Sequence, residues 1–184
     1  MLEAAVRIVA ERGLEELTLA ECGEAAGYSR GLAAHYFGSR EGLLTAIANH
    51  IVADYSRRLR VGGGRRTGLE GLLDNVAFYI DSGRGNVTVL RAFHAVLGSA
   101  LKQAPLSNAI ATLNRNSIAG FAGLIRRGIE RGEIRSDIDA TAQASLIVAA
   151  LRGIMTQWLL DPERIDLDAI ALEYIGTLRR GLAT

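Results

Sequence analysis

The sequence has few of the residues from which enzymes and disulfide-rich proteins build their sites. It contains one cysteine, Cys22, and three histidines, His35, His50 and His94, in 184 residues. A single cysteine excludes an internal disulfide bond and favours a reducing compartment. The scattered histidines show no metal-ligand spacing, and neither a nucleophile motif nor a glycine-rich phosphate loop accompanies them. We therefore expect no catalytic residue, no metal site, no cofactor and no enzymatic activity.

Prolines and long apolar runs are also scarce. Only Pro105 and Pro162 occur, so long stretches rich in Ala, Leu, Arg and Glu are free to form helices. A hydrophobic content of 49% with 22% charged residues is typical of a folded globular chain. No apolar run reaches the roughly 20 residues that span a bilayer. The first residues lack the features of a signal peptide, so we expect a cytoplasmic protein without a membrane partner.

The apolar periodicity predicts an all-α fold of about nine helices. The first helix is expected over residues 2–12, where Leu2, Ala5, Val6 and Val9 share one face. Hydroxyl residues that favour helix starts precede the next three. These helices are a short one from Thr18 to Gly27, a third after Ser29, and a fourth from Ser39 towards Leu59. Five more are expected over about 69–81, 87–102, 107–131, 140–160 and 167–182, after a break at Gly62-Gly63-Gly64-Arg65-Arg66.

Three short helices within about 36 residues, two of them joined by a glycine-containing turn, are typical of a helix-turn-helix. In that motif the second helix of the pair enters the major groove of DNA. The segment Thr18–Leu44 resembles the tetracycline-repressor-like (TetR) family of bacterial regulators. The resemblance is carried by Ala25-Ala26-Gly27-x-Ser29-x-Gly31, by His35-Tyr36-Phe37 and by Gly38-Ser39-Arg40-Glu41-Gly42-Leu43-Leu44, with weaker echoes at residues 131–137 and 157–162.

This resemblance implies two parts. Residues 1–45 are expected to form the helix-turn-helix DNA-binding domain. Residues 46–184 are expected to form a helical domain that binds an effector and dimerises. The implied function is a ligand-responsive repressor that binds a palindromic double-stranded operator as a homodimer, in the bacterial cytoplasm at the nucleoid.

Physical chemistry gives each position of the motif a role. Helix starts offer backbone N–H groups and hydroxyls to phosphate. Gly31 allows a close approach to the duplex, and Arg40 matches a phosphate-binding lysine of the family while adding bidentate geometry. Leu32 and Ala33 indicate apolar base contacts, for example to thymine methyl groups. Phe37 is interpreted as a core residue. The candidate DNA-binding residues are Thr18, Tyr28, Ser29, Arg30, Gly31, Leu32, Ala33, His35, Tyr36 and Arg40.

Three features depart from this pattern. Residues 1–50 contain four cations and seven anions, a net charge of −3, whereas DNA-binding domains usually carry a basic surface. Ala34 stands where the family often has an aromatic residue. The sequence begins directly at its first predicted helix, without the basic residues that often precede it in the family. We expect modest, strongly salt-sensitive affinity for DNA. The alternative function is a dimeric ligand-binding or protein-interaction module whose DNA-binding domain has decayed.

The predicted helix 140–160 is apolar on more than one side, so it must be buried on several sides. It is either the central core helix of a monomer or a helix that also packs against a second subunit. With the resemblance, we expect a homodimer through helices at about 140–160 and 167–182. A small apolar effector is expected among aromatic and polar side chains, although for any one of them core packing is the commoner role than ligand contact. The candidates are Phe78, Phe93, His94, Phe121, Met155 and Trp158, with Tyr79 and Asn114 as further polar groups.

Overall fold

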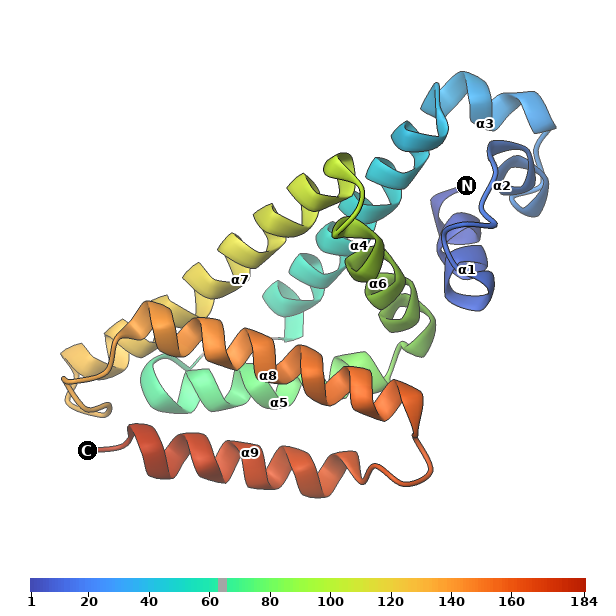
Figure 1. The fold of residues 1–184 in the computed structure, drawn as a ribbon. Coiled ribbons are helices and arrows are strands. Elements are labelled where there is room, and N and C mark those ends of the chain that lie inside the picture. Colours follow the sequence, from blue (N-terminus) through green and yellow to red (C-terminus); the bar gives the residue numbers. More distant parts are fainter. Residues whose placement is uncertain (63–65) are drawn as a thin grey trace. The chain divides into compact units, whose positions relative to one another are not determined.

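The structure, a computed structural model, describes residues 1–62 and 66–184. Within them the chain is all-helical, as predicted, and its one β-type pairing is an isolated bridge between Ile134 and Ala183. None of the described helices is long and apolar enough to cross a membrane. The helices are α1 (Leu2–Arg12), α2 (Leu19–Ala25), α3 (Arg30–Phe37), α4 (Arg40–Gly62), α5 (Gly68–Arg84), α6 (Val87–Ala100), α7 (Ala104–Glu130), α8 (Ala140–Leu160) and α9 (Leu167–Leu182) (Figure 1).

The chain divides into two compact units, and the division falls within α4 and α7. Unit 1 comprises Met1–Arg57 and Gly85–Leu113. Unit 2 comprises Arg58–Arg84 and Asn114–Thr184. The predicted boundary between functional domains, after residue 45, stays a prediction.

Unit 1 has one apolar core, in which α1 packs against α6 and α2 packs against α3. Cys22 is fully buried in this core, where its side chain packs as a small hydrophobic group. Phe37 is partly buried against the same core, which confirms its predicted role. The most deeply buried large side chains of the unit are Leu17, Leu43, Leu44, Ile47 and Leu106.

All three predicted helix starts are confirmed, but only two of the three hydroxyls make a capping hydrogen bond. Thr18 and Glu21 form a complete capping box, in which the Glu21 N–H donates to Thr18 Oγ1 (3.2 Å) and the Thr18 N–H donates to Glu21 Oε2 (3.2 Å). Ser39 Oγ accepts from the Gly42 N–H at 3.1 Å, at the start of α4. Ser29 occupies the N-cap position of α3, but its hydroxyl makes no capping hydrogen bond. The start of α3 therefore leaves backbone donors for another acceptor.

Two other helix boundaries differ from the prediction. α5 runs to Arg84, beyond the expected stop at residue 81, so that Gly83 lies inside the helix and only Gly85 belongs to the turn. α7 begins at Ala104 rather than after Pro105, since proline in a first helical turn lacks only a donor that has no partner there. At the predicted break, Gly62 still belongs to α4, whereas Gly63, Gly64 and Arg65 lie outside the described residues.

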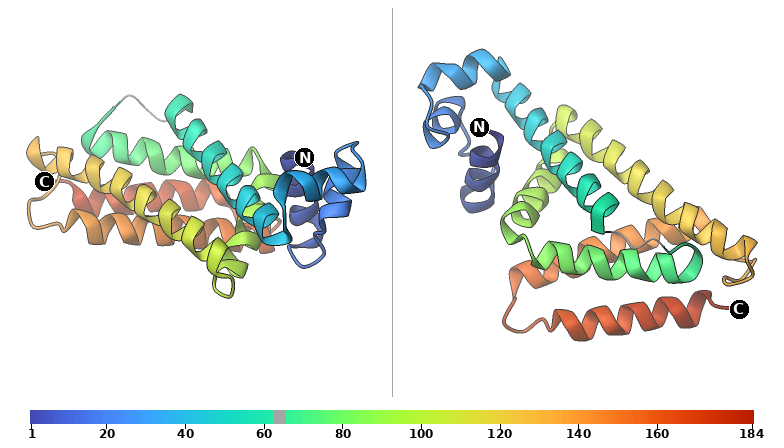
Figure 2. Two further views of the ribbon diagram at one scale, coloured as in Figure 1. Left: turned by 90° about the horizontal axis from the view of Figure 1, so that it is seen from above. Right: turned by 180° about the vertical axis from the view of Figure 1, so that it is seen from behind.

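Unit 2 consists mainly of α5, α8 and α9, which lie side by side (Figures 1 and 2). The turn after α7 is bonded both to the start of α5 and to the end of α9. Glu133 Oε2 accepts from the Leu69 N–H at 2.9 Å and so caps the start of α5. The Arg135 N–H donates to the Leu182 carbonyl at 2.9 Å, and Thr184 Oγ1 donates to the Gly132 carbonyl at 3.0 Å. The segment 131–137 therefore has a structural role in holding α5 and the end of α9.

Candidate nucleic-acid interface

The turn between α2 and α3 is closed by close backbone packing. Gly27 has a φ of 78°, which glycine adopts without strain. The Tyr28 N–H donates to the Gly23 carbonyl at 2.9 Å. A Cβ atom on Gly23 would lie 2.8 Å from the Ser29 carbonyl oxygen, so only glycine fits where α2 meets the start of α3. Sequence reasoning did not single out Gly23, and the signal that could have identified it is a glycine inside a short helix.

The eight residues of α3 divide into a buried side and an exposed side. Ala33 is fully buried, so it cannot contact a duplex, and this corrects its prediction as a base-contacting residue. Tyr36 is 70% exposed, Tyr28 before the helix is 52% exposed, and Leu32 is 36% exposed. The other exposed residues of the helix are Arg30, Gly31, Ala34 and His35.

Gly31 has no structural reason to be glycine within this chain. Its φ is not positive, and a Cβ atom there would meet nothing within 4 Å. Glycine in a helix costs about 1 kcal/mol relative to alanine. A glycine that the fold does not require, on the exposed side of the predicted reading helix, leaves room for a close approach by an external partner.

The arginines near the motif all have partners within the chain. Arg12 Nη1 lies 3.1 Å from Glu21 Oε1, and Arg30 Nε donates to the carboxylate of Glu24. The hydrogen bond from Thr18, with Arg12 adding to it, lowers the pKa of Glu21, and Glu24 raises the pKa of Arg30.

Arg40 is held by backbone carbonyls before α2. Its Nη2 donates to the Leu14 carbonyl at 2.7 Å and its Nε donates to the Leu17 carbonyl at 3.2 Å. The guanidinium therefore ties the start of α4 to the segment between α1 and α2. Its Nη1 donors take no part in these two bonds, and the predicted contact with phosphate stays a prediction.

Two of the candidate effector residues lie in unit 1, on α6. Phe93 is buried, and its ring meets that of His94 edge-on at 5.4 Å. His94 Nδ1 lies 2.9 Å from the Leu90 carbonyl, an acceptor, so Nδ1 carries the proton. His94 Nε2 is then an acceptor, and it is buried without a hydrogen-bond partner among the described residues.

The other four candidates lie in unit 2. Phe121 and Met155 are buried, whereas Phe78 and Trp158 are half-buried. Asn114, on α7, has a buried Oδ1 without a partner in the part of the chain that the structure describes. Contact between any of these residues and an effector stays a prediction.

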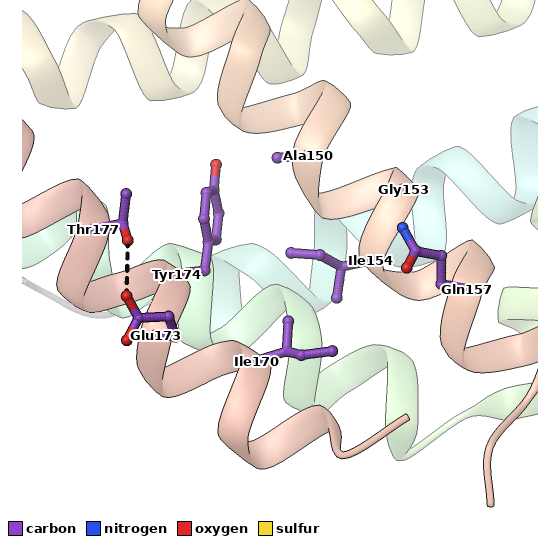
Figure 3. Close-up of a pocket in the computed structure, with 8 residues that line it drawn as sticks. All are labelled: Ala150, Gly153, Ile154, Gln157, Ile170, Glu173, Tyr174 and Thr177. Atoms are coloured by element: carbon purple, nitrogen blue, oxygen red, sulfur yellow. Dashed lines mark hydrogen bonds between the residues drawn. The ribbon is translucent and has the colours of Figure 1, made fainter. Parts of the chain in front are cut away.

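A groove runs between α8 and α9 in unit 2. Its volume is about 470 Å³. Ile154 of α8 and Ile170 and Tyr174 of α9 point towards one another across it (Figure 3). Burial raises the pKa of Tyr174 to about 12. The lining is completed by Ala150, Gly153, Gln157, Glu173 and Thr177, which sequence reasoning had not named.

Three of the four groove-lining residues of α8 belong to a longer, mostly apolar seam. Leu146, Ala150, Gly153, Gln157 and Leu160 follow one another at spacings of four, three, four and three residues. This spacing places them on one helical face, as in the seam of packed parallel or antiparallel helices. The two large apolar side chains of this face, Leu146 and Leu160, are 64% and 80% exposed. This spacing was the signal in the sequence that could have identified the face.

Comparisons with known proteins agree over the whole chain. Residues 1–47 match bacterial regulatory proteins of the tetR family, and residues 69–180 match the C-terminal part of BetI-type transcriptional repressors. The HTH-type transcriptional repressor KstR2 of Rhodococcus jostii is 25% identical over 190 residues, covering 100% of this chain and 90% of that protein. The HTH-type transcriptional regulator BetI of Paraburkholderia phytofirmans is 27% identical over 187 residues, covering 95% and 89%. A crystal structure of a Rhodococcus sp. protein assigned to the TetR family superposes with a TM-score of 0.83 at 25% identity, covering 99% and 96%.

The family consists of transcriptional regulators rather than enzymes. The two matched regions, the all-helical fold and the helix-turn-helix formed by α2 and α3 lead to one conclusion. The chain belongs to the tetR family of bacterial regulatory proteins, with a C-terminal part of the BetI type, and is a ligand-responsive, DNA-binding transcriptional regulator.

Proposed function

We propose that this protein is a homodimeric repressor in which two copies of α3 read the two halves of a palindromic operator. The observation that carries the proposal is Gly31, an exposed glycine of α3 that the fold itself does not require. Residues 1–45 would supply the DNA-binding domain, and residues 46–184 the effector-binding and dimerisation domain. A DNA target of this kind places the protein at the nucleoid in the bacterial cytoplasm.

The residues around α3 offer contacts of several kinds to DNA. Tyr28 and Tyr36 are exposed phenols whose hydroxyls can bond phosphate oxygens, and His35 lies on the same helix. The N–H groups at the start of α3 are not capped by Ser29, so they can serve a phosphate as well. Arg30 and Leu32 remain as candidates for base contacts, the first polar and the second apolar. The hydroxyl of Thr18 is already engaged in the capping box of α2. We therefore propose that Thr18 contributes to DNA binding only through the position of its backbone at the start of α2.

Dimerisation is proposed through the seam of α8 and the facing residues of α9. Leu146 and Leu160 of α8 are large apolar side chains with exposed fractions of 64% and 80%. Covering an exposed leucine contributes about 1.5–3 kcal/mol. Gly153 has open space where a Cβ would stand, so a neighbouring helix can approach α8 closely there. Two copies of α8 and α9 would form a four-helix interface.

The effector is proposed to be a small, mostly apolar molecule. In unit 2, Phe121 and Met155 provide buried apolar surface, and Phe78 and Trp158 provide half-buried aromatic surface. In unit 1, Phe93 is a separate buried candidate. Each unit has one buried polar atom without a partner among the described residues, His94 Nε2 in unit 1 and Asn114 Oδ1 in unit 2, and either could bond a polar group of a ligand bound in its own unit. Release of the operator follows if the effector binds better to a conformation in which the two copies of α3 no longer match successive major grooves.

Selection of bound sequences from a random duplex library, at low salt, tests the proposal. The wild-type protein should enrich a palindrome whose halves are spaced by one turn of DNA. Gly31→Leu should abolish the enrichment and leave the helix content and thermal unfolding unchanged, because the added side chain meets open space in the free protein. Gly98→Leu is the matched control, since Gly98 is an exposed helical glycine with equally open surroundings on α6. Absence of any enriched motif with the wild-type protein would overturn the proposal in favour of a protein-interaction module.

A further inference from the structure

The exposed side of α3 offers few side chains that can read a base edge by hydrogen bonds. Gly31, Leu32 and Ala34 carry no polar group, and Ala33 is buried. Arg30 is the one Lys or Arg between Thr18 and Ser39. Any hydrogen-bonded recognition of a base by the first turn of α3 therefore depends on how the Arg30 guanidinium is placed.

That placement is set by an acidic residue of the neighbouring helix. The Glu24 carboxylate, on α2, accepts a hydrogen bond from Arg30 Nε. The side chains of Arg30 and Glu24 are 76% and 47% exposed, so the pair lies at the surface beside the tight turn. An arginine has one donor on Nε and four on its two Nη atoms. With Nε engaged by Glu24, the two Nη atoms remain as a planar fork.

This fork has the geometry that recognises guanine. Two parallel N–H groups of an arginine fit the O6 and N7 acceptors of guanine in the major groove. A carboxylate at Nε fixes the direction of the fork before DNA is bound, so less side-chain freedom is lost on binding. Exposed ion pairs add little to folding stability. A carboxylate near phosphates also weakens binding to every sequence, so the arrangement favours selectivity over affinity.

We propose that Glu24 is a positioning residue that holds the Arg30 guanidinium end-on for bidentate recognition of one guanine in each operator half-site. The inference rests on the proposed function, namely that α3 reads operator DNA. It adds the base recognised, the residue that recognises it and a second residue that sets its geometry.

The test is selection from a random duplex library with the wild-type protein and three carboxylate variants. Glu24→Ala removes the acceptor at Nε, whereas Glu24→Gln keeps an acceptor oxygen and loses only the charge. Glu11→Gln, at an exposed carboxylate of α1, is the matched control for charge alone. The wild-type motif should contain one G·C pair per half-site that is preferred by about tenfold or more. Glu24→Ala should reduce that preference to about twofold to threefold at this position alone, while both Gln variants keep it.

The Arg30→Ala variant identifies the base pair that Arg30 recognises. It should remove the same preference, and Glu24→Ala should then have no further effect in the Arg30→Ala background. Unchanged preference in Glu24→Ala, or equal losses at every position of the motif, would overturn the assignment. If the wild-type protein enriches no motif, both the proposed function and this inference fail. If it enriches a palindrome that does not depend on Arg30 and Glu24, this inference alone fails.

Discussion

Two surfaces of the molecule expose large hydrophobic side chains, and they do so with different residues. Around α3 the exposed residues are Tyr28, Leu32 and Tyr36, two of which end in a hydroxyl. On α8 they are Leu146 and Leu160, which have no polar atom in the side chain. Phenols suit a partner that offers both apolar and hydrogen-bonding groups, as DNA does, whereas leucines suit another apolar protein surface.

The charges beside the two surfaces differ as well. Near α3, Arg12 and Arg30 pair with Glu21 and Glu24, and Arg40 bonds backbone carbonyls. These internal partners must be kept or exchanged when DNA binds. In the α8–α9 groove, Glu173 pairs with Arg180 at 2.6 Å at the rim, while the centre is apolar. The comparison predicts a salt-sensitive DNA interface and a largely salt-insensitive subunit interface.

The largest expected effect comes from placing a charge in the α8 seam. Gly153→Glu should convert the dimer to a monomer at micromolar concentration, because burying an unpaired carboxylate between subunits costs several kcal/mol. The folded monomer should persist, since a Cβ at Gly153 meets nothing within 4 Å and glutamate favours helices. Light scattering measures the mass, with Gly98→Glu as the control that stays dimeric. A dimeric Gly153→Glu protein would place the subunit interface elsewhere.

Substitutions of Arg40 test whether its guanidinium stabilises the fold or binds DNA. Arg40→Ala removes two hydrogen bonds to the carbonyls of Leu14 and Leu17, so the free energy of unfolding should fall by about 1–2 kcal/mol. Lysine cannot reproduce both bonds, so Arg40→Lys should recover only part of the loss. Urea unfolding measures both variants. An unchanged unfolding midpoint combined with lost DNA binding would show that Arg40 serves phosphate instead.

Removal of a single hydroxyl from α3 should have a smaller effect, confined to DNA. Tyr36→Phe keeps the ring, which contacts Phe37 edge-on at 4.9 Å, so stability should not change. Operator affinity should fall by about threefold to tenfold through the loss of one hydrogen bond to phosphate, equally for all sequences. Fluorescence anisotropy with a labelled operator measures the loss. Equal affinity of Tyr36→Phe and wild type would remove this hydroxyl from the interface.

The smallest expected effect is a loss of folding stability at alkaline pH, which depends on Tyr174 of α9. The pKa of Tyr174 is raised from 10 to about 12 by burial, so folding favours the neutral phenol. The resulting stabilisation is complete below pH 10 and is lost as the pH rises through 12, because the unfolded chain ionises first. The midpoint temperature of thermal unfolding should therefore fall more steeply with rising pH in wild type than in Tyr174→Phe across this pH range. Parallel curves for the two proteins would refute the shift, and DNA selectivity at lower pH should be the same in both.

Much of the helix-turn-helix could be predicted because its signals are local. The capping box of Thr18 and Glu21, the turn at Gly27 and the start of α4 at Ser39 each depend on residues within a few positions of one another. The same holds for α8 and α9, which begin after Asp139 and Asp166 with side-chain caps. These starts are encoded by hydrogen bonds that a single helical turn can make, so the linear sequence contains them.

The faces of the helices could be predicted only in part. α3 has eight residues, about two turns, and apolar residues occur on all sides of it, so periodicity alone did not show that Ala33 is inside while Leu32 is outside. The packing of α3 against α2 through Gly23 made that choice. Arg40 was expected at phosphate, but its partners, Leu14 and Leu17, lie more than 20 residues away in the sequence.

The sequence by itself determined where the helices lie, where the DNA-binding motif begins and ends, and which family pattern the chain follows. The tertiary structure alone decided which side chains of those helices remain exposed, which cations are already engaged, and that α8 and α9 leave an apolar groove between them. The physical reason is how far apart the interacting residues lie along the sequence. Caps and turns are formed by neighbours along the chain, whereas exposure and ion pairing depend on which distant helices pack together.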